Sequence, residues 1–135
     1  MNDDRFKNWK KPRLDDEGWA YPDVTSMQMK QNAYGWRCQH PEGLEIGHRV
    51  DIGCFTYMNA KYGIEIAENV QIGSHCAIYS DDTERGVYGR VTIGKNALIG
   101  SHTVILPGAT IKPGAKIPIG SVIKGRNVFE REPTK

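Results

Sequence analysis

The sequence predicts an all-β protein whose main domain is a parallel β-helix, and three observations support this prediction. The chain of 135 residues is long enough for one domain, and it has 15 glycines but few patterns typical of helices. From Ile93 onward an aliphatic residue recurs at every sixth position. A second column, from Val50 to Ser121, places a small or β-branched residue four positions after the aliphatic one, and Tyr62 breaks this rule. Two columns with one period indicate a short strand and a corner in each six residues.

The six-residue repeat covers most of the chain. The aliphatic column comprises Ile46, Ile52, Met58, Ile64, Ile66, Ile72, Ile78, Ile93, Ile99, Ile105, Ile111, Ile117 and Ile123. It slips by two residues at Ile66, and the 15 residues from Ile78 to Ile93 equal one repeat plus an insertion of nine. Strand alternation places both columns on the inner side. Three repeats make a triangular coil, so the sequence predicts about four stacked coils.

This repeat divides the chain into three segments. Residues 43–126 form the predicted β-helix, residues 1–42 a non-repeat cap or arm, and residues 127–135 a short tail. The N-terminal segment, residues 1–42, contains all three tryptophans, Trp9, Trp19 and Trp36. A cap would cover the unpaired strand groups at the open end of the first coil.

The corners of the coils place chemically interesting residues together. The tetrapeptide IGSH occurs at residues 72–75 and again at 99–102, and the spacing of 27 residues equals one coil plus the insertion. We therefore expect Ser74-His75 and Ser101-His102 to lie one above the other on one edge. Cys54-Phe55 and Ile119-Gly120 should lie next to them in the flanking coils. The insertion, about residues 80–90, should protrude as a loop from the neighbouring edge.

Composition argues against several classes of partner. With 18 basic and 16 acidic residues, the chain has no electrostatic case for binding nucleic acid or a membrane surface. No apolar stretch approaches the roughly 20 residues that a membrane span needs. The polar start MNDDRFKNWKKPRL does not resemble a signal peptide. Three cysteines without metal-ligand spacing favour a reducing cytoplasm.

The repeated EIG, DIG, QIG, TIG and LIG motifs, followed by VILPGATIKPGAKI, resemble the hexapeptide-repeat acyltransferases over roughly residues 43–126. The segment IGSHTVILPGATIKPGAKIPIGSVIKG is most similar to the sugar O- and N-acetyltransferases of that family. The resemblance implies a left-handed β-helix, contrary to the usual right-handed crossover. It also implies a homotrimer with sites between subunits, acetyl-CoA as co-substrate and no metal. The implied reaction acetylates an amino or hydroxyl group of a sugar or nucleotide-linked sugar, in surface polysaccharide biosynthesis.

Acetyl transfer is helped by a base with a pKa near 7 that takes a proton from the acceptor. The sugar O-acetyltransferases carry a histidine for this purpose in a motif close to IYTATHP, where this chain reads IYSDDTE, with Thr83 in place of the histidine. We expect His75 to be the replacement, and the alternative is that it is a turn residue. Two further possibilities are an amine acceptor that needs little help and a protein that is not an enzyme.

Four residues near the insertion are candidates for binding the acceptor. The resemblance places Asn59 where related enzymes hold the acceptor with an acidic or amide side chain. Tyr79 ends the strand before the insertion, and Asp81 and Asp82 begin it. Their carboxylates suit a sugar hydroxyl or ammonium group. The alternative readings are a turn residue for Asn59 and loop solubility for the two aspartates.

The resemblance also assigns residues to the donor. Ser101, with His102 beside it, should contact the thioester region, Ile119 should line the pantetheine arm, and Lys124 should lie further along. Arg126 joins Lys124 in a basic C-terminal coil that suits phosphates. The alternatives are a turn residue for His102 and a solvated edge for the cations.

Two rival functions remain open. A γ-class carbonic anhydrase needs three histidines that converge on a metal between subunits. The spacing of His40, His48, His75 and His102 offers no close pair. The second rival is a non-catalytic hexapeptide-repeat scaffold or inactive subunit, which the missing loop histidine favours.

Overall fold

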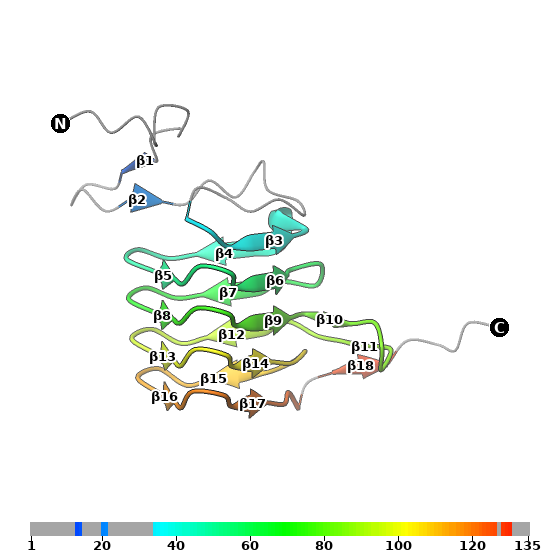
Figure 1. Cartoon of the computed structure of the whole chain (residues 1–135). Coiled ribbons are helices and arrows are strands. Elements are labelled where there is room, and N and C mark those ends of the chain that lie inside the picture. The colour runs from blue at the N-terminus through cyan, green and yellow to red at the C-terminus, as the bar shows by residue number, and fades with distance from the viewer. Residues whose placement is uncertain (1–12, 15–19, 22–33, 127, 131–135) are drawn as a thin grey trace.

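The computed structural model describes residues 13–14, 20–21, 34–126 and 128–130, with side chains for 34–126 and 128–130. Its strands wind into a stack of coils with three parallel sheets (Figure 1). The first sheet contains β4 (Leu44–Ile46), β7 (Ile64–Ile66), β12 (Val91–Ile93) and β15 (Thr110–Ile111). The second contains β5 (Asp51–Ile52), β8 (Gln71–Ile72), β13 (Leu98–Ile99) and β16 (Lys116–Ile117). The third contains β3 (Arg37–Gln39), β6 (Tyr57–Asn59), β9 (Ala77–Tyr79), β14 (Val104–Ile105) and β17 (Val122–Ile123).

The predicted fold is confirmed: the domain is a left-handed parallel β-helix of about four coils. The reason lies in the register, which pairs like with like in successive coils. In the second sheet Ile52 pairs with Ile72, Ile72 with Ile99, and Ile99 with Ile117. Each of these side chains points inward, and burial of one isoleucine contributes about 1.5–3 kcal/mol. The aliphatic column is therefore the core of the domain.

The two-residue slip has a structural explanation. Met58 and Ile66 lie in consecutive strands, β6 and β7, whose corner is two residues longer than an ordinary one. Ile64 occupies the inner position that a small residue holds in other repeats, and it pairs with Leu44 and Val91. Tyr62 is thereby displaced to the outside of the corner.

The β-helix extends upstream of the expected start at residue 43. Strand β3 pairs in parallel with β6, so that Cys38 lies over Met58. Trp36 and Cys38 are buried and cover the inner end of the first complete coil. A short 3-10 helix, η2 (Pro41–Gly43), connects β3 to β4. Further upstream, β1 (Arg13–Leu14) pairs with β2 (Ala20–Tyr21), and Trp9 and Trp19 lie outside the described residues.

The insertion protrudes as predicted and is itself paired. Strands β10 (Asp81–Asp82) and β11 (Val87–Tyr88) form a hairpin. The C-terminal strand β18 (Phe129–Glu130) returns from the last coil and pairs with β11 (Figure 1). The predicted tail thus contributes a third strand to the insertion. Within the described ranges, no helix is long and apolar enough to cross a membrane.

Candidate functional site

The two IGSH segments lie at the edge where the second sheet meets the third. Successive coils are joined here by backbone hydrogen bonds from His75 N–H to Cys54 O, from His102 N–H to Ser74 O and from Gly120 N–H to Ser101 O. The second corner position of each coil therefore forms a column of four residues, Phe55, His75, His102 and Gly120, which we call the ring column. The predicted stacking of the two histidine corners is confirmed.

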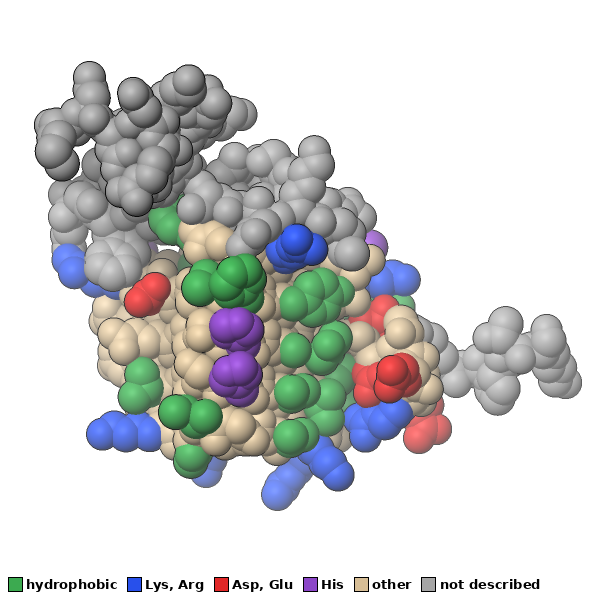
Figure 2. Space-filling model, viewed as in Figure 1, with side chains coloured by type: hydrophobic (Ala, Val, Ile, Leu, Met, Phe, Trp, Pro, Cys, Tyr) green, Lys and Arg blue, Asp and Glu red, His purple; other side chains and the backbone are tan. Residues whose placement is uncertain are grey.

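The rings of this column are in contact with one another. The centroids of Phe55 and His75 are 5.1 Å apart, with planes inclined by 34°. Those of His75 and His102 are 4.9 Å apart and nearly parallel, at 11°. Both distances match the spacing of about 4.8 Å between neighbouring strands. Figure 2 shows the two imidazoles as a vertical pair on an otherwise uncharged part of the surface.

The backbone of the ring column is left-handed, with φ values of 64° at Phe55, 58° at His75, 59° at His102 and 77° at Gly120. The corners between the first and second sheets have the same conformation at Arg49, Asn69, Asn96 and Gly114. Asparagine and histidine tolerate this region better than most residues, whereas a bulky residue such as phenylalanine is strained there. The corner conformation thus sets the positions from which the side chains of the column start.

The His75 imidazole makes one side-chain hydrogen-bond contact, to the neighbouring serine. The side chain is exposed, and Nδ1 lies 3.0 Å from the Ser74 hydroxyl oxygen. When Nδ1 carries the proton and donates it to this oxygen, the Nε2 lone pair is left to accept a proton. The tautomer that suits catalysis is therefore compatible with the observed contact.

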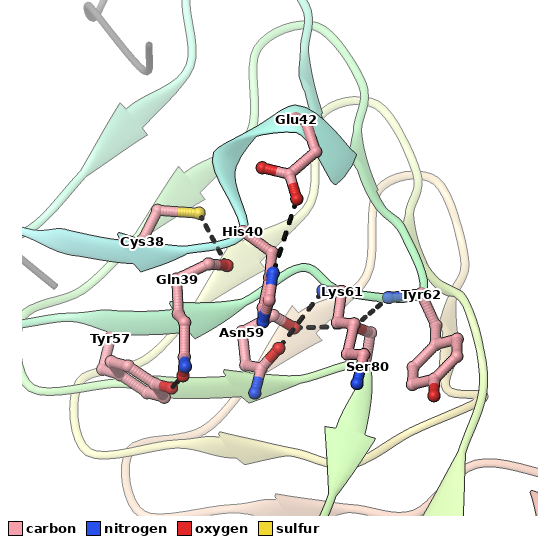
Figure 3. Close-up of polar contacts among 9 residues, drawn as sticks. All are labelled: Cys38, Gln39, His40, Glu42, Tyr57, Asn59, Lys61, Tyr62 and Ser80. Atoms are coloured by element: carbon pink, nitrogen blue, oxygen red, sulfur yellow. Dashed lines mark hydrogen bonds and ion pairs between the residues drawn. The ribbon is translucent and has the colours of Figure 1, made fainter. Parts of the chain in front are cut away.

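A second polar group lies at the edge where the third sheet meets the first (Figure 3). The Asn59 side-chain oxygen accepts the Lys61 N–H at 3.1 Å. The Ser80 hydroxyl donates to the Asn59 backbone oxygen at 2.7 Å and accepts the Tyr62 N–H at 3.0 Å. Asn59 and Ser80 thus stabilise the long corner and the start of the insertion. The Asn59 side chain is buried, and its oxygen is engaged in a turn.

Tyrosines occupy the third sheet's outer face beside Asn59. The Tyr57 hydroxyl donates to the Gln39 side-chain oxygen at 2.6 Å, and the Tyr57 and Tyr79 rings lie 5.7 Å apart. Burial raises the pKa of Tyr57, Tyr79 raises it further, and a side-chain hydrogen bond with Asn59 opposes these effects. Tyr57 therefore stays protonated at neutral pH, as a hydrogen-bond donor. Sequence reasoning missed Tyr57 and Gln39, although their spacing of one coil would have revealed the pair.

The aspartates of the insertion have different environments. Asp82 accepts hydrogen bonds from the Arg85 backbone N–H at 3.2 Å and from its guanidinium Nε at 2.8 Å. Asp82 is therefore engaged in closing the hairpin turn. Asp81 is buried at the base of the hairpin. Thr83, where the resemblance expected a histidine, is an exposed turn residue.

Aromatic rings fasten the insertion to the domain. Tyr88 stacks on Tyr62 at 4.2 Å on one side and on Phe129 at 5.5 Å on the other. Arg90 forms ion pairs with Glu45 at 3.3 Å and Glu65 at 3.5 Å on the first sheet. The insertion is thus a fixed projection of the scaffold.

The candidate site residues fall into two groups on opposite edges of the third sheet. The first edge holds His75, Ser101, His102 and Ile119. The second holds Asn59, Tyr79, Asp81, Asp82, Lys124 and Arg126. From His75 to Tyr79 the chain runs across the sheet for four residues, or roughly 13 Å when extended. One chain does not bring the predicted base and the predicted acceptor residues into contact.

The outer face of the third sheet, between these edges, is largely apolar. Tyr57, Ala77, Val104 and Val122 follow one another down successive strands. Val122 is 58% exposed, and Ile119 at the adjoining corner is 75% exposed. The other described histidines are elsewhere: His48 lies at the corner between the first and second sheets, and His40 between the third and first.

Compared with the known protein families and with curated proteins, the sequence matches none.

Proposed function

We propose that this protein transfers an acetyl group from acetyl-CoA to an amino or hydroxyl group of a sugar or nucleotide-linked sugar, and that it works as a homotrimer. The observation that carries the proposal is His75, an exposed imidazole on a left-handed corner whose Nδ1 contacts a serine hydroxyl. The resemblance of the repeat to sugar acetyltransferases supplies the choice of donor and acceptor.

The residues suggest the following reaction. His75 Nε2 takes the proton of the acceptor as its nitrogen or oxygen attacks the thioester carbonyl carbon. The tetrahedral intermediate then loses the thiolate as the C–S bond breaks. The imidazolium returns its proton to the sulfur, so the products are CoA thiol and the acetylated acceptor. Phosphates of the donor would lie near Lys124 and Arg126.

A second copy of the chain would bring residues of the two edges together in one site. Since His75 and the acceptor group lie on opposite sides of one sheet, the insertion of a neighbouring copy would complete the site. The exposed apolar residues on and beside the third sheet, Phe55, Ile119 and Val122, support such an interface. Light scattering after size-exclusion chromatography should give the mass of three chains.

The activity is tested by thiol release from acetyl-CoA with a panel of amino and hydroxy sugars. Loss of a general base lowers the rate by roughly 10²–10⁴-fold, so His75→Ala should fall by this factor. His48→Ala, a corner histidine on another edge, is the matched control and should retain the rate. If His75→Ala retains the turnover rate of the wild type, a group other than His75 is the general base. Failure of the wild type to bind acetyl-CoA would favour the non-catalytic scaffold.

A further inference from the structure

The ring column has three rings and four positions. Phe55, His75 and His102 fill the first three, and Gly120, with no side chain, stands at the fourth. Apart from Gly120 itself and its chain neighbours Ile119 and Ser121, no atom of the described residues lies within 4 Å of the point where a Cβ on Gly120 would be. Among those residues, His75 is the one ring that stacks on His102. The column therefore ends in an open position, one coil beyond His102.

Exposed aliphatic side chains border this open position. Ile119 directly precedes Gly120, and Val122 follows it two residues later; they are 75% and 58% exposed. A planar ring placed here would lie against the His102 imidazole at the spacing of one coil, with apolar side chains beside it. Stacking of this kind accepts any flat aromatic ring, because every such ring has a π-face.

The charge of the last coils adds a second, independent condition. From Val91 to Arg126 the sequence has no aspartate or glutamate and five basic residues, Lys95, Lys112, Lys116, Lys124 and Arg126. Lys116 and Lys124, both exposed, each stand four residues from Gly120 along the chain, so each lies across one strand from the open position, roughly 13 Å away when extended. Negatively charged groups would therefore be attracted to both sides of the open position without repulsion from neighbouring carboxylates.

We propose that the open position at Gly120 binds the base of a nucleotide, which stacks on His102 while its phosphates lie toward Lys116 or Lys124. A planar ring that carries phosphates satisfies both conditions, whereas an aromatic side chain of a partner satisfies only the first. The inference rests on the proposed function only for the source of the nucleotide. That source is the adenosine end of CoA or the nucleoside diphosphate of a nucleotide-linked sugar.

Gly120→His is the variant that tests the site. The two preceding coils carry histidine at the same corner position with φ near 60°, so the fold accepts this residue there. The new imidazole would occupy the open position and exclude a base. Gly114→His is the matched control, because Gly114 has φ 73° and equally open surroundings but lies on a different edge. His102→Asn removes the ring and keeps a residue that tolerates the left-handed conformation.

Calorimetric titrations of the full chain at one salt concentration would use four probes: CoA, adenosine 3′,5′-bisphosphate, uridine diphosphate and pyrophosphate. Loss of one stacked base should weaken nucleotide binding by roughly five- to 150-fold in Gly120→His and His102→Asn. Gly114→His should bind like the wild type, and pyrophosphate should bind more weakly than the nucleotides. Preference for the two adenosine probes would identify the donor, and preference for uridine diphosphate the acceptor.

Three results would overturn the inference: no nucleotide binding by the wild type, equal binding of pyrophosphate, or binding unchanged in Gly120→His. A change in oligomeric mass in Gly120→His, with nucleotide binding intact, would assign the position to a partner side chain and also overturn it. The acetyl-transfer assay separates the two proposals. If nucleotide binding is weakened by Gly120→His and His102→Asn but the wild type releases no thiol, the proposed function alone is refuted. If the wild type releases thiol and Gly120→His still binds nucleotides as the wild type does, this inference alone is refuted.

Discussion

Replacement of Gly73 by alanine should separate the two histidine corners and destabilise the domain. Gly73 directly precedes Ser74 and lies against the backbone of the next coil. A Cβ at Gly73 would lie 2.6 Å from Ser101 N and 2.8 Å from Ser101 Cα. Ordinary contact begins at 3.4 Å, so the backbone must move by about 3.4 − 2.6 = 0.8 Å.

The magnitude follows from two opposing terms. Overpacking of a tight interior costs about 1–3 kcal/mol. Gly73 does not have a positive φ, so alanine fits its backbone conformation. Alanine also lowers the conformational entropy of the unfolded chain, which stabilises the folded state by about 0.4–1 kcal/mol. A backbone neighbour yields less than a flexible side chain, so we expect a net loss of about 2 kcal/mol. The loss should appear as a lower denaturation midpoint in urea, at constant protein concentration.

Gly86→Ala is the control for the glycine substitution itself. Gly86 has φ 68°, and apart from Gly86 and its chain neighbours no atom of the described residues lies within 4 Å of a new Cβ, so this variant introduces strain without a clash. NMR of the imidazole protons should show a change at His75 and His102 in Gly73→Ala and none in Gly86→Ala. If Gly73→Ala proves as stable as the wild type, the close approach of the coils does not constrain this corner.

Three further outcomes can be checked in the same preparations. Thr56→Val should lower the free energy of unfolding by about 1–3 kcal/mol in urea, because the buried Thr56 hydroxyl donates to Gly73 O at 2.9 Å and accepts the Cys76 N–H at 3.2 Å. Arg90→Ala should lower it by at most about 1 kcal/mol, and less at high salt, because its ion pairs are exposed. Burial and then Glu42 raise the pKa of Cys38 from 9.0 to about 12. The contribution of Cys38 to the free energy of unfolding should be present below pH 9 and lost as the pH rises toward 12. At pH 8.5 iodoacetamide should modify the exposed Cys54 in the folded protein, and it should modify the buried Cys38 only after unfolding.

The fold was predictable because the residue types in each repeat indicate where its strand and its corner lie. An aliphatic residue, a small residue and a two-residue turn at constant spacing leave one way to stack the coils, and from it the superposition of His75 on His102 follows. Ile64 was harder to place, because the column shows a slip of two residues but not whether the extra residues lie before or after Ile64. The contacts of β3 and β18 could not be predicted, since neither segment carries the repeat. Their positions depend on Trp36 in the core and on Phe129 stacked against Tyr88.

The ring column itself raises the question of why histidine, and not asparagine, stands at these corners. The corner between the first and second sheets uses Asn69 and Asn96 in the same conformation. A non-glycine residue in this conformation costs roughly 1–2 kcal/mol, less for asparagine and histidine, and one stacked ring pair contributes about 0.5–1.5 kcal/mol. Asparagine would lose the two ring contacts of His75, worth about 1–3 kcal/mol together, and its lower cost in this conformation offsets part of that loss.

The double variant His75→Asn/His102→Asn should therefore lower the free energy of unfolding by at most about 3 kcal/mol. Urea denaturation measures this difference directly. A much larger loss would mean that the imidazoles are retained for packing. A small loss, together with abolished thiol release, would leave their proton chemistry and their flat faces as the reasons for two histidines on one edge.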